Sequence, residues 1–205
     1  MFAITADQVD SRHQPDRASQ QILELTALIS AGLVLPVDRT AGDEIQLLLA
    51  SAQDTLVALL LLTRSGHWSV GCGIGSVNTP LPANAREAGG DAFVAAREAV
   101  NEAKKSENRF ALRSVAQPAA ASDCEAVIDL LLQLRRRRSP EGWAIYDLLA
   151  TGVTQVSAAK TLGITPQATS KRARTAAVRA EFAALSPLAR MLASVHVITA
   201  GERNQ

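Results

Sequence analysis

Four polar residues in the C-terminal third of the chain follow one another at helical spacing: Gln167, Ser170, Lys171 and Arg174. Residues three and four positions apart lie on one face of an α-helix. Amide, hydroxyl, ammonium and guanidinium groups are the side chains that hydrogen-bond base edges in the major groove of DNA. The spacing therefore predicts a helix with one face suited to contacting DNA bases.

Two short helices and a tight turn, within residues 154–174, are predicted to hold these side chains. Thr154 and Thr165 precede the two helices, and threonine caps a helix by accepting a backbone N–H bond. Pro166 suits the first position of the second helix, where no N–H donor is needed. Gly163 suits the left-handed conformation that ends the first helix. The two helices are expected to touch at Ala159, Leu162, Ile164 and Thr169.

Charge in this region has one sign. Residues 150–180 contain no Asp or Glu, and their basic residues are Lys160, Lys171, Arg172, Arg174 and Arg179. Lys and Arg bind the phosphate backbone of nucleic acids whatever the sequence. We expect backbone phosphates to be contacted or positioned by Thr154, Gln155, Thr165 and Arg172. An ordinary helical hairpin with a solvated basic face is the alternative.

The pattern T-Q-x-x-A-A-x-x-L-G-I-[ST]-x-Q-A-[TV]-S-x-R begins at Thr154 and resembles the helix-turn-helix of sigma-factor region four and of many bacterial regulators. This resemblance implies a recognition helix that binds double-stranded DNA. Thr169 and Ala173 stand where larger apolar residues are usual in that motif. Neighbouring helices are therefore expected to supply the missing packing.

A run of four arginines ends the helix predicted just before this region: Arg135, Arg136, Arg137 and Arg138. Ser122 and Glu125 fit a capping box, which predicts the start of that helix after a linker at residues 116–121. Cations at a helix C-terminus are favoured by the helix dipole. They are also well placed to meet DNA phosphates, although a solvated surface cluster would look the same in sequence.

The first 117 residues alternate between apolar runs and helical periods. Strands are expected at residues 2–6, 33–40, 45–50, 68–74 and 109–115, and helices at residues 17–29, 51–63 and 91–105. The order of the first six elements predicts a ferredoxin-like sheet, extended by one helix and one strand. Gly71, Gly73 and Gly75 lack the Lys-Ser/Thr of a phosphate loop. We expect instead a glycine-rich strand that passes close to a neighbour.

Two carboxylates are predicted to meet at one end of this sheet. Asp7 follows the first strand, and Asp43 lies in the turn of the central hairpin, residues 41–44. In a ferredoxin-like sheet the first strand lies beside that hairpin. Converging carboxylates can hold a divalent cation such as Mg²⁺, and the cation can hold a triphosphate. The alternative is that both residues serve turns, which Asp favours.

Short motifs in this half resemble proteins that act on nucleotides. D-x-V-D-S, G-D-E and G-D-A-F-x-A-A-R look like the class III nucleotide cyclase and GGDEF-type fold. A-D-Q-V-D-S-R, A-G-D-E-I-Q-x-L-L, G-C-G-I-G and D-A-F-x-A-A-R-E-A resemble the bacterial SatD family more closely. That family also ends in a helix-turn-helix, so the similarity runs from residue 2 to about residue 180.

This resemblance implies a nucleotide or metal site in the front half. Asp7 and Asp43 match the metal-binding acids, Glu44 matches the acid beside the second one, and Arg97 resembles the arginine near the phosphates. The asparagine usual one turn before that arginine is absent, and residues 93–94 are Phe-Val. Cyclisation needs several groups aimed together at the transition state. We therefore expect no catalytic residues, and a domain that binds a nucleotide, or only dimerises.

Composition is that of a globular protein. The 205 residues are 47% apolar and 20% charged, with a net charge of +1. The only cysteines, Cys72 and Cys124, form no metal or disulfide pattern, which fits a reducing cytoplasm. No signal peptide or membrane span is expected. Residues 118–205 hold 11 Lys+Arg against 7 Asp+Glu. The basic half is thus the one expected to meet nucleic acid.

These observations predict an α+β protein of two domains. Residues 1–117 would form an inactive cyclase-like sheet domain, and residues 118–205 a helical DNA-binding domain. The predicted function is transcriptional regulation by a homodimer, modulated by a nucleotide. One alternative is a metal-dependent nucleotide cyclase or phosphohydrolase that uses Asp7 and Asp43. Another is a helical half that binds protein, in which case binding would ignore salt.

Overall fold

The computed structural model describes residues 1–40 and 42–201, with the backbone alone for residues 197–201. Contacts divide the chain into two compact units. Unit 1 contains Met1–Asp129 and the segment that begins at Leu188, and unit 2 contains Leu130–Pro187. This division differs from the predicted boundary between residues 117 and 118. The reason is that two long helices, one at each junction, each belong partly to both units.

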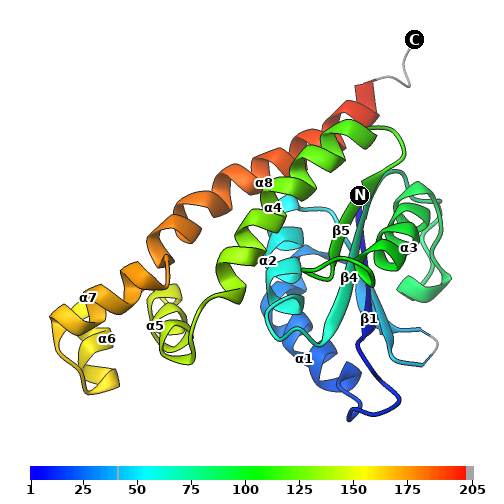
Figure 1. Cartoon of the computed structure of the whole chain (residues 1–205). Helices are drawn as coiled ribbons and strands as arrows, with labels where there is room; N and C mark the ends of the chain where they lie inside the picture. The colour runs from blue at the N-terminus through cyan, green and yellow to red at the C-terminus, as the bar shows by residue number, and fades with distance from the viewer. Residues whose placement is uncertain (41, 202–205) are drawn as a thin grey trace. The chain divides into compact units, whose positions relative to one another are not determined.

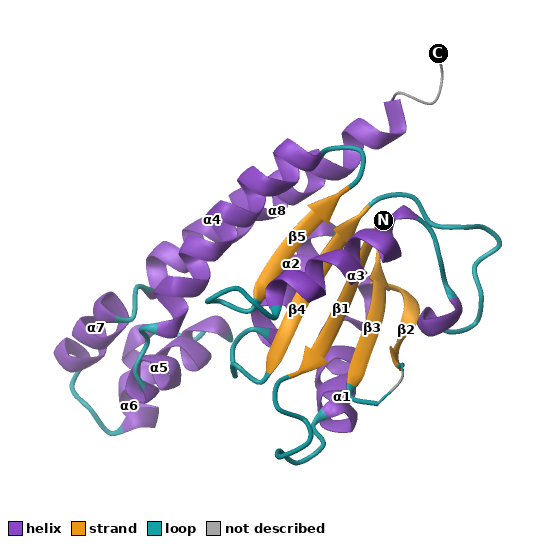
Figure 2. Cartoon of the chain, turned by 45° about the vertical axis from the view of Figure 1, so that its right-hand side comes forward, coloured by secondary structure: helices purple, strands orange, loops and turns teal. Residues whose placement is uncertain are grey.

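Unit 1 contains a five-stranded mixed sheet in the order β2-β3-β1-β4-β5 (Figures 1 and 2). Only β4 and β5 pair in parallel, and the other neighbours are antiparallel. All five predicted strands are confirmed within one or two residues. Their bounds are β1 Phe2–Gln8, β2 Leu33–Arg39, β3 Glu44–Leu49, β4 Trp68–Ile74 and β5 Phe110–Ser114. Ala41, in the predicted hairpin turn, lies outside the described residues.

Helices cover both faces of this sheet. Helix α3, Asp91–Ala103, lies across one face, and α1, Ala18–Ile29, and α2, Ala52–Leu62, lie on the other (Figures 1 and 2). Ser51 caps α2 by accepting a bond from the backbone N–H of Asp54. Two short 3-10 helices, Ser30–Gly32 and Ala85–Glu87, complete unit 1.

Glycines in β4 allow α3 to lie directly on the sheet. A Cβ atom at Gly71 would come within 2.1 Å of the backbone nitrogen of Val100, and one at Gly73 within 2.1 Å of the carbonyl oxygen of Ala92. Neither position leaves room for a side chain, because the neighbouring atoms are helix backbone. The predicted strand that passes close to a neighbour is thus confirmed. This close packing fixes the distance of α3 side chains from the sheet.

Helix α4, Pro118–Arg136, begins before the predicted capping box. The predicted linker at residues 116–121 is therefore wrong. Proline is tolerated in the first turn of a helix, and the three alanines that follow it have the highest helix propensity. Glu125 instead covers the edge strand β5: its Oε2 accepts bonds from the backbone N–H of Leu112 at 2.5 Å and from Arg113 at 2.7 Å. A paired edge is protected from pairing with other chains.

Helix α8, Val178–Gly201, is continuous and contains Pro187. The helix runs through this proline, although the two units divide there. The segment after it packs with unit 1. Leu188, Leu192 and Val195 are buried there, and the ring of His196 stacks on that of Phe2 with centroids 5.2 Å apart.

Unit 2 contains three short helices, α5 Pro140–Ala150, α6 Gln155–Leu162 and α7 Pro166–Thr175, with the flanking ends of α4 and α8. Its small core is built mainly from short side chains. The buried members are Ile145, Ala158, Ala173, Ala176 and Val178, and Tyr146, Leu148, Leu149 and Leu162 pack around them. Helices α5 and α8 thus supply the packing that the small residues of α7 do not provide.

Candidate functional site

The turn between α6 and α7 is fixed by local hydrogen bonds. The hydroxyl oxygen of Thr154 accepts a bond from the backbone N–H of Ser157 at 3.2 Å, and that of Thr165 from Ala168 at 3.1 Å. Gly163 ends α6 in the left-handed conformation, at φ 62°. All three roles agree with the sequence prediction. The two threonines therefore position the start of each helix, whatever else they contact.

Helix α7 has one buried face and one exposed face. Thr169 and Ala173 are almost completely buried, at 0% and 3% exposure. Gln167, Lys171 and Arg174 are exposed, and Ser170 and Arg172 are half-buried. Among the described residues, none of the three exposed side chains has a hydrogen-bond or ion-pair partner. The residues predicted to contact bases thus lie together on one side of a packed helix, with their polar groups unengaged.

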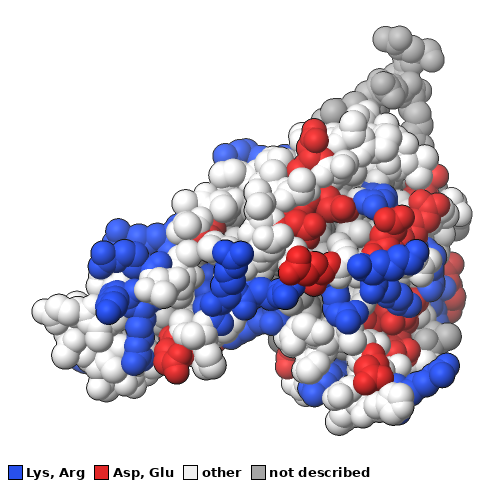
Figure 3. Space-filling model, viewed as in Figure 1, with Lys and Arg blue, Asp and Glu red and all other residues white. Residues whose placement is uncertain are grey.

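Basic side chains dominate the surface of unit 2. Figure 3 shows many more Lys and Arg atoms than Asp and Glu atoms on its visible face. The acids of unit 2 are Glu141, Asp147 and Glu181. Glu181 is completely buried and therefore adds nothing to the surface. The exposed face of α7 thus lies in a mainly cationic surface, which suits a polyanionic partner.

The four consecutive arginines do not act as one cluster. Arg135 and Arg138 are buried, at 6% and 7% exposure, so their prediction as phosphate contacts is wrong. Both pair with the buried carboxylate of Glu181; the contact of the Arg138 Nη2 atom is 2.6 Å. Their guanidinium groups also lie over aromatic rings: Arg138 is 4.5 Å from the ring centroids of Trp143 and Tyr146. Only Arg136 and Arg137 are exposed.

Sequence reasoning missed Glu181, which joins the end of α4 to the start of α8. The sequence did contain a signal for an ion pair here, because Glu181 is the only acid between Asp147 and residue 201. An isolated acid 43 positions after an arginine run suggests a pairing, but the sequence does not say which arginines it selects. Burial and the neighbouring Glu181 carboxylate also raise the pKa of the Tyr146 hydroxyl. This tyrosine therefore stays neutral at physiological pH.

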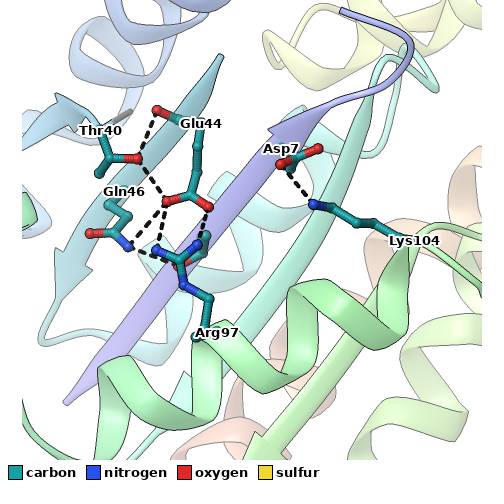
Figure 4. Close-up of polar contacts among 7 residues, drawn as sticks. Asp7, Thr40, Glu44, Gln46, Arg97 and Lys104 are labelled. Atoms are coloured by element: carbon teal, nitrogen blue, oxygen red, sulfur yellow. Dashed lines mark hydrogen bonds and ion pairs between the residues drawn. The ribbon is translucent and has the colours of Figure 1, made fainter. Parts of the chain in front are cut away.

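In unit 1, the structure brings together two of the four predicted nucleotide or metal residues. The guanidinium of Arg97, on α3, donates to both carboxylate oxygens of Glu44, on β3, at 2.6 and 3.0 Å (Figure 4). Thr40 and Gln46 also donate to that carboxylate, at 2.7 and 3.5 Å. The carboxylate of Glu44 is thus buried and fully engaged.

Asp7 forms an ion pair with Lys104. It lies opposite Glu44 in the β1–β3 register, and its carboxylate accepts a 2.8 Å bond from Lys104, also on α3 (Figure 4). Asp43 is half-buried in the turn before β3. Within the described part of the chain, no three Asp, Glu, His or Cys side chains are grouped as a metal site needs. Both strand carboxylates are thus neutralised by α3 rather than left for Mg²⁺.

A shallow hollow of about 510 Å³ lies beside Arg97 in unit 1. Its lining includes Arg86, Gln46, Phe93 and Val94, but neither Asp7 nor Asp43. The lining also contains Glu98, and Arg86 and Arg97 are paired with Asp38 and Glu44, so the hollow presents both signs of charge beside the exposed Val94. The residue pair Phe93 and Val94, which replaces the polar group usual in cyclases, forms part of this wall.

The two ion pairs of α3 allow a matched test. Replacing Arg97 by alanine should destabilise the chain by about 1–2 kcal/mol, because Glu44 would keep its buried charge without a cation. The Lys104→Ala variant should cost less than about 1 kcal/mol, because the carboxylate of Asp7 is less buried than that of Glu44. Urea denaturation followed by fluorescence of Trp68, in β4, measures both. Equal losses of stability in the two variants would mean that the burial of Glu44 does not determine how much its ion pair contributes.

Comparisons with known proteins identify no relative. No protein-family model matches the sequence, and searches of curated proteins and of solved structures found no significant match. Across residues 1–40 and 42–201, no helix combines the length and the apolar character that crossing a bilayer requires.

Proposed function

We propose that unit 2 binds double-stranded DNA through a helix-turn-helix, formed by α6 and α7, with α7 as the recognition helix. The observation that carries the proposal is the exposed face of α7. Gln167, Lys171 and Arg174 project from a helix whose opposite face is packed, and they have no partners within the described chain. Ser170 lies on the same side, half-buried. The resemblance to region four of sigma factors supports the same assignment.

We propose transcriptional regulation in the cytoplasm as the role of this binding, by a homodimer. A single recognition helix contacts only a few base pairs, so one copy gives little specificity, whereas two copies read two half-sites. For unit 1, the strand order β2-β3-β1-β4 supports a ferredoxin-like sheet of the nucleotide-cyclase type. Together with the terminal helix-turn-helix, this favours the SatD family.

Unit 1 is proposed to sense a nucleotide rather than to turn it over. The hollow beside Arg97 offers a binding place, while Asp7 and Glu44 are engaged with Lys104 and Arg97. A metal-dependent cyclase or phosphohydrolase that uses Asp7 and Asp43 would need Asp7 free to hold the cation. Release of product from ATP or GTP with Mg²⁺ or Mn²⁺, lost on Asp43→Asn, would favour the enzyme over the sensor.

Capture of genomic DNA fragments by the purified chain tests the proposed function. The experiment is done at near-physiological salt, with and without a mixture of nucleotides. We expect a few strongly enriched sites, and a change in their enrichment when nucleotides are present. Uniform or absent enrichment would argue against a sequence-specific regulator. Binding of protein partners that is insensitive to salt would support an interaction module instead.

A further inference from the structure

Two hollows flank α7 within unit 2. We name them the α5 hollow and the α8 hollow after the second helix that lines each. The α5 hollow, about 350 Å³, is lined by Arg137, Ser139, Gly142, Lys171 and Arg172, among others. The α8 hollow, about 420 Å³, is lined by Gln155, Ser170, Arg174 and Arg179, among others. Each is large enough to receive a phosphate group with its hydration water.

The hollows lie on opposite sides of α7. Within α7, residues 168, 172 and 175 border the α5 hollow, and residues 170 and 173 border the α8 hollow. Each set repeats at intervals of three or four residues and so follows one side of the helix. The two sets are offset by two residues, which is about 200° around a helix. Gln167, Lys171 and Arg174 form the ridge between the hollows.

Each hollow presents cations and no carboxylate in its lining. Lys171, Arg172 and the exposed Arg137 border the α5 hollow, and Arg174 and Arg179 border the α8 hollow. Arg137 and Arg179 have no ion-pair partner among the described residues. Glu141 lies close to the α5 hollow, since a hydrogen bond with Ser139 and the nearby charge of Arg172 help to lower the pKa of its carboxyl. Side chains with this chemistry fit phosphate oxygens.

We propose that the two hollows receive backbone phosphates from the two different strands that border one DNA major groove. A helix is about 10–12 Å wide and the major groove about 12 Å wide, so a helix that fills the groove has one backbone on each side. A single strand has one backbone and can occupy one hollow only. The inference rests on the proposed function, and it assigns Arg137 and Arg179 to opposite strands.

The test uses the full-length chain and a duplex enriched in the capture experiment. The variants are Arg137→Gln for the α5 hollow and Arg179→Gln for the α8 hollow. Each should reduce the slope of log affinity against log salt by about one, since one phosphate contact is lost. Each should weaken enriched and random duplexes equally. Lys160→Gln removes one charge from α6 at a residue that lines neither hollow, and should leave the slope unchanged.

Strand assignment is tested with duplexes that carry neutral methylphosphonate linkages on one strand only. Neutral linkages on one strand should abolish the effect of Arg137→Gln, and those on the other strand the effect of Arg179→Gln. The proposal would be overturned if neutral linkages on one and the same strand abolished the effects of both variants. It would also be overturned if neither variant changed the salt slope. Equal affinity of the parent for single-stranded DNA would also overturn it.

Two further controls distinguish the phosphates of a bound duplex from free phosphate ions, and a failure of the hollow assignment from a failure of DNA binding. Competition by inorganic phosphate at millimolar concentration should not release the duplex; release would mean that the hollows are sites for the free anion. If the parent chain binds no duplex, the proposed function itself fails. If it binds a duplex with sequence preference but the variants behave like Lys160→Gln, only the assignment of the hollows fails.

Replacing Glu141 is expected to strengthen DNA binding, whereas the two arginine variants weaken it. Glutamine at this position keeps a hydrogen-bond partner for Ser139 and removes a negative charge close to the α5 hollow. We expect Glu141→Gln to raise affinity for any duplex about two- to five-fold at low salt, with the gain shrinking as salt screens the charge. Fluorescence anisotropy at two salt concentrations measures this. A loss of affinity would contradict a phosphate in the α5 hollow.

Discussion

Replacing Glu181 by alanine is expected to destabilise unit 2 by about 3–5 kcal/mol, because two arginines would keep buried charges without a carboxylate. Arg135 and Arg138 approach Glu181 from the end of α4, and Arg138 also donates through Nε to the carbonyl oxygen of Ala176 at 3.0 Å. The loss compares with about 5–15 kcal/mol for the whole stability of a typical domain. This makes Glu181 the most sensitive single position of unit 2.

Fluorescence of Trp143 can follow the unfolding of unit 2. Its ring lies 4.9 Å from the Arg135 guanidinium, so loss of the cluster should change its emission. The other tryptophan, Trp68, lies in unit 1, and both the variant and its reference therefore carry Trp68→Phe. Glu141→Gln is the matched control, since it removes an exposed acid and should change stability by less than about 0.5 kcal/mol. A cost below about 1 kcal/mol for Glu181→Ala would contradict a structural role of the ion pairs.

The largest functional effect is expected from replacing Lys171 and Arg174 together by alanine. A good contact to a base edge discriminates by about 1–3 kcal/mol, so the pair should weaken binding to an enriched duplex by about 100-fold or more. The fold should be unaffected, because both side chains are exposed and have no partners among the described residues. Affinity for a random duplex should fall less, because it loses only charge contacts, so the ratio of the two affinities should fall as well.

Anisotropy titrations with enriched and random duplexes measure the two effects, and far-UV circular dichroism with a thermal melt checks the fold. Lys160→Ala serves as a control, because Lys160 lies on α6 and is also exposed. It should change affinity much less. Unchanged binding by the double variant, with a normal melting temperature, would remove the recognition-helix assignment.

Sequence alone was sufficient for the turn between α6 and α7. Thr154, Thr165 and Gly163 act through hydrogen bonds and dihedral angles within a few residues of their own positions. Such preferences are local properties of the chain, so they survive in any packing. The same holds for the strands, where apolar runs and glycines gave boundaries within one or two residues. The direction of the exposed face of α7 followed from the helical period.

Only the tertiary structure decided which of the charged side chains are exposed and unpaired. Four identical arginines stand in a row, yet two turn inward because Glu181 is buried 43 to 46 positions later. Likewise Asp7 lies near the end of β1 and Glu44 at the start of β3, but α3 supplies their cations from 53 to 97 positions away. The free energy of a charge depends on burial and on partners that are distant in sequence. Composition and spacing give the charges of this chain, whereas packing determines which of them can face a ligand.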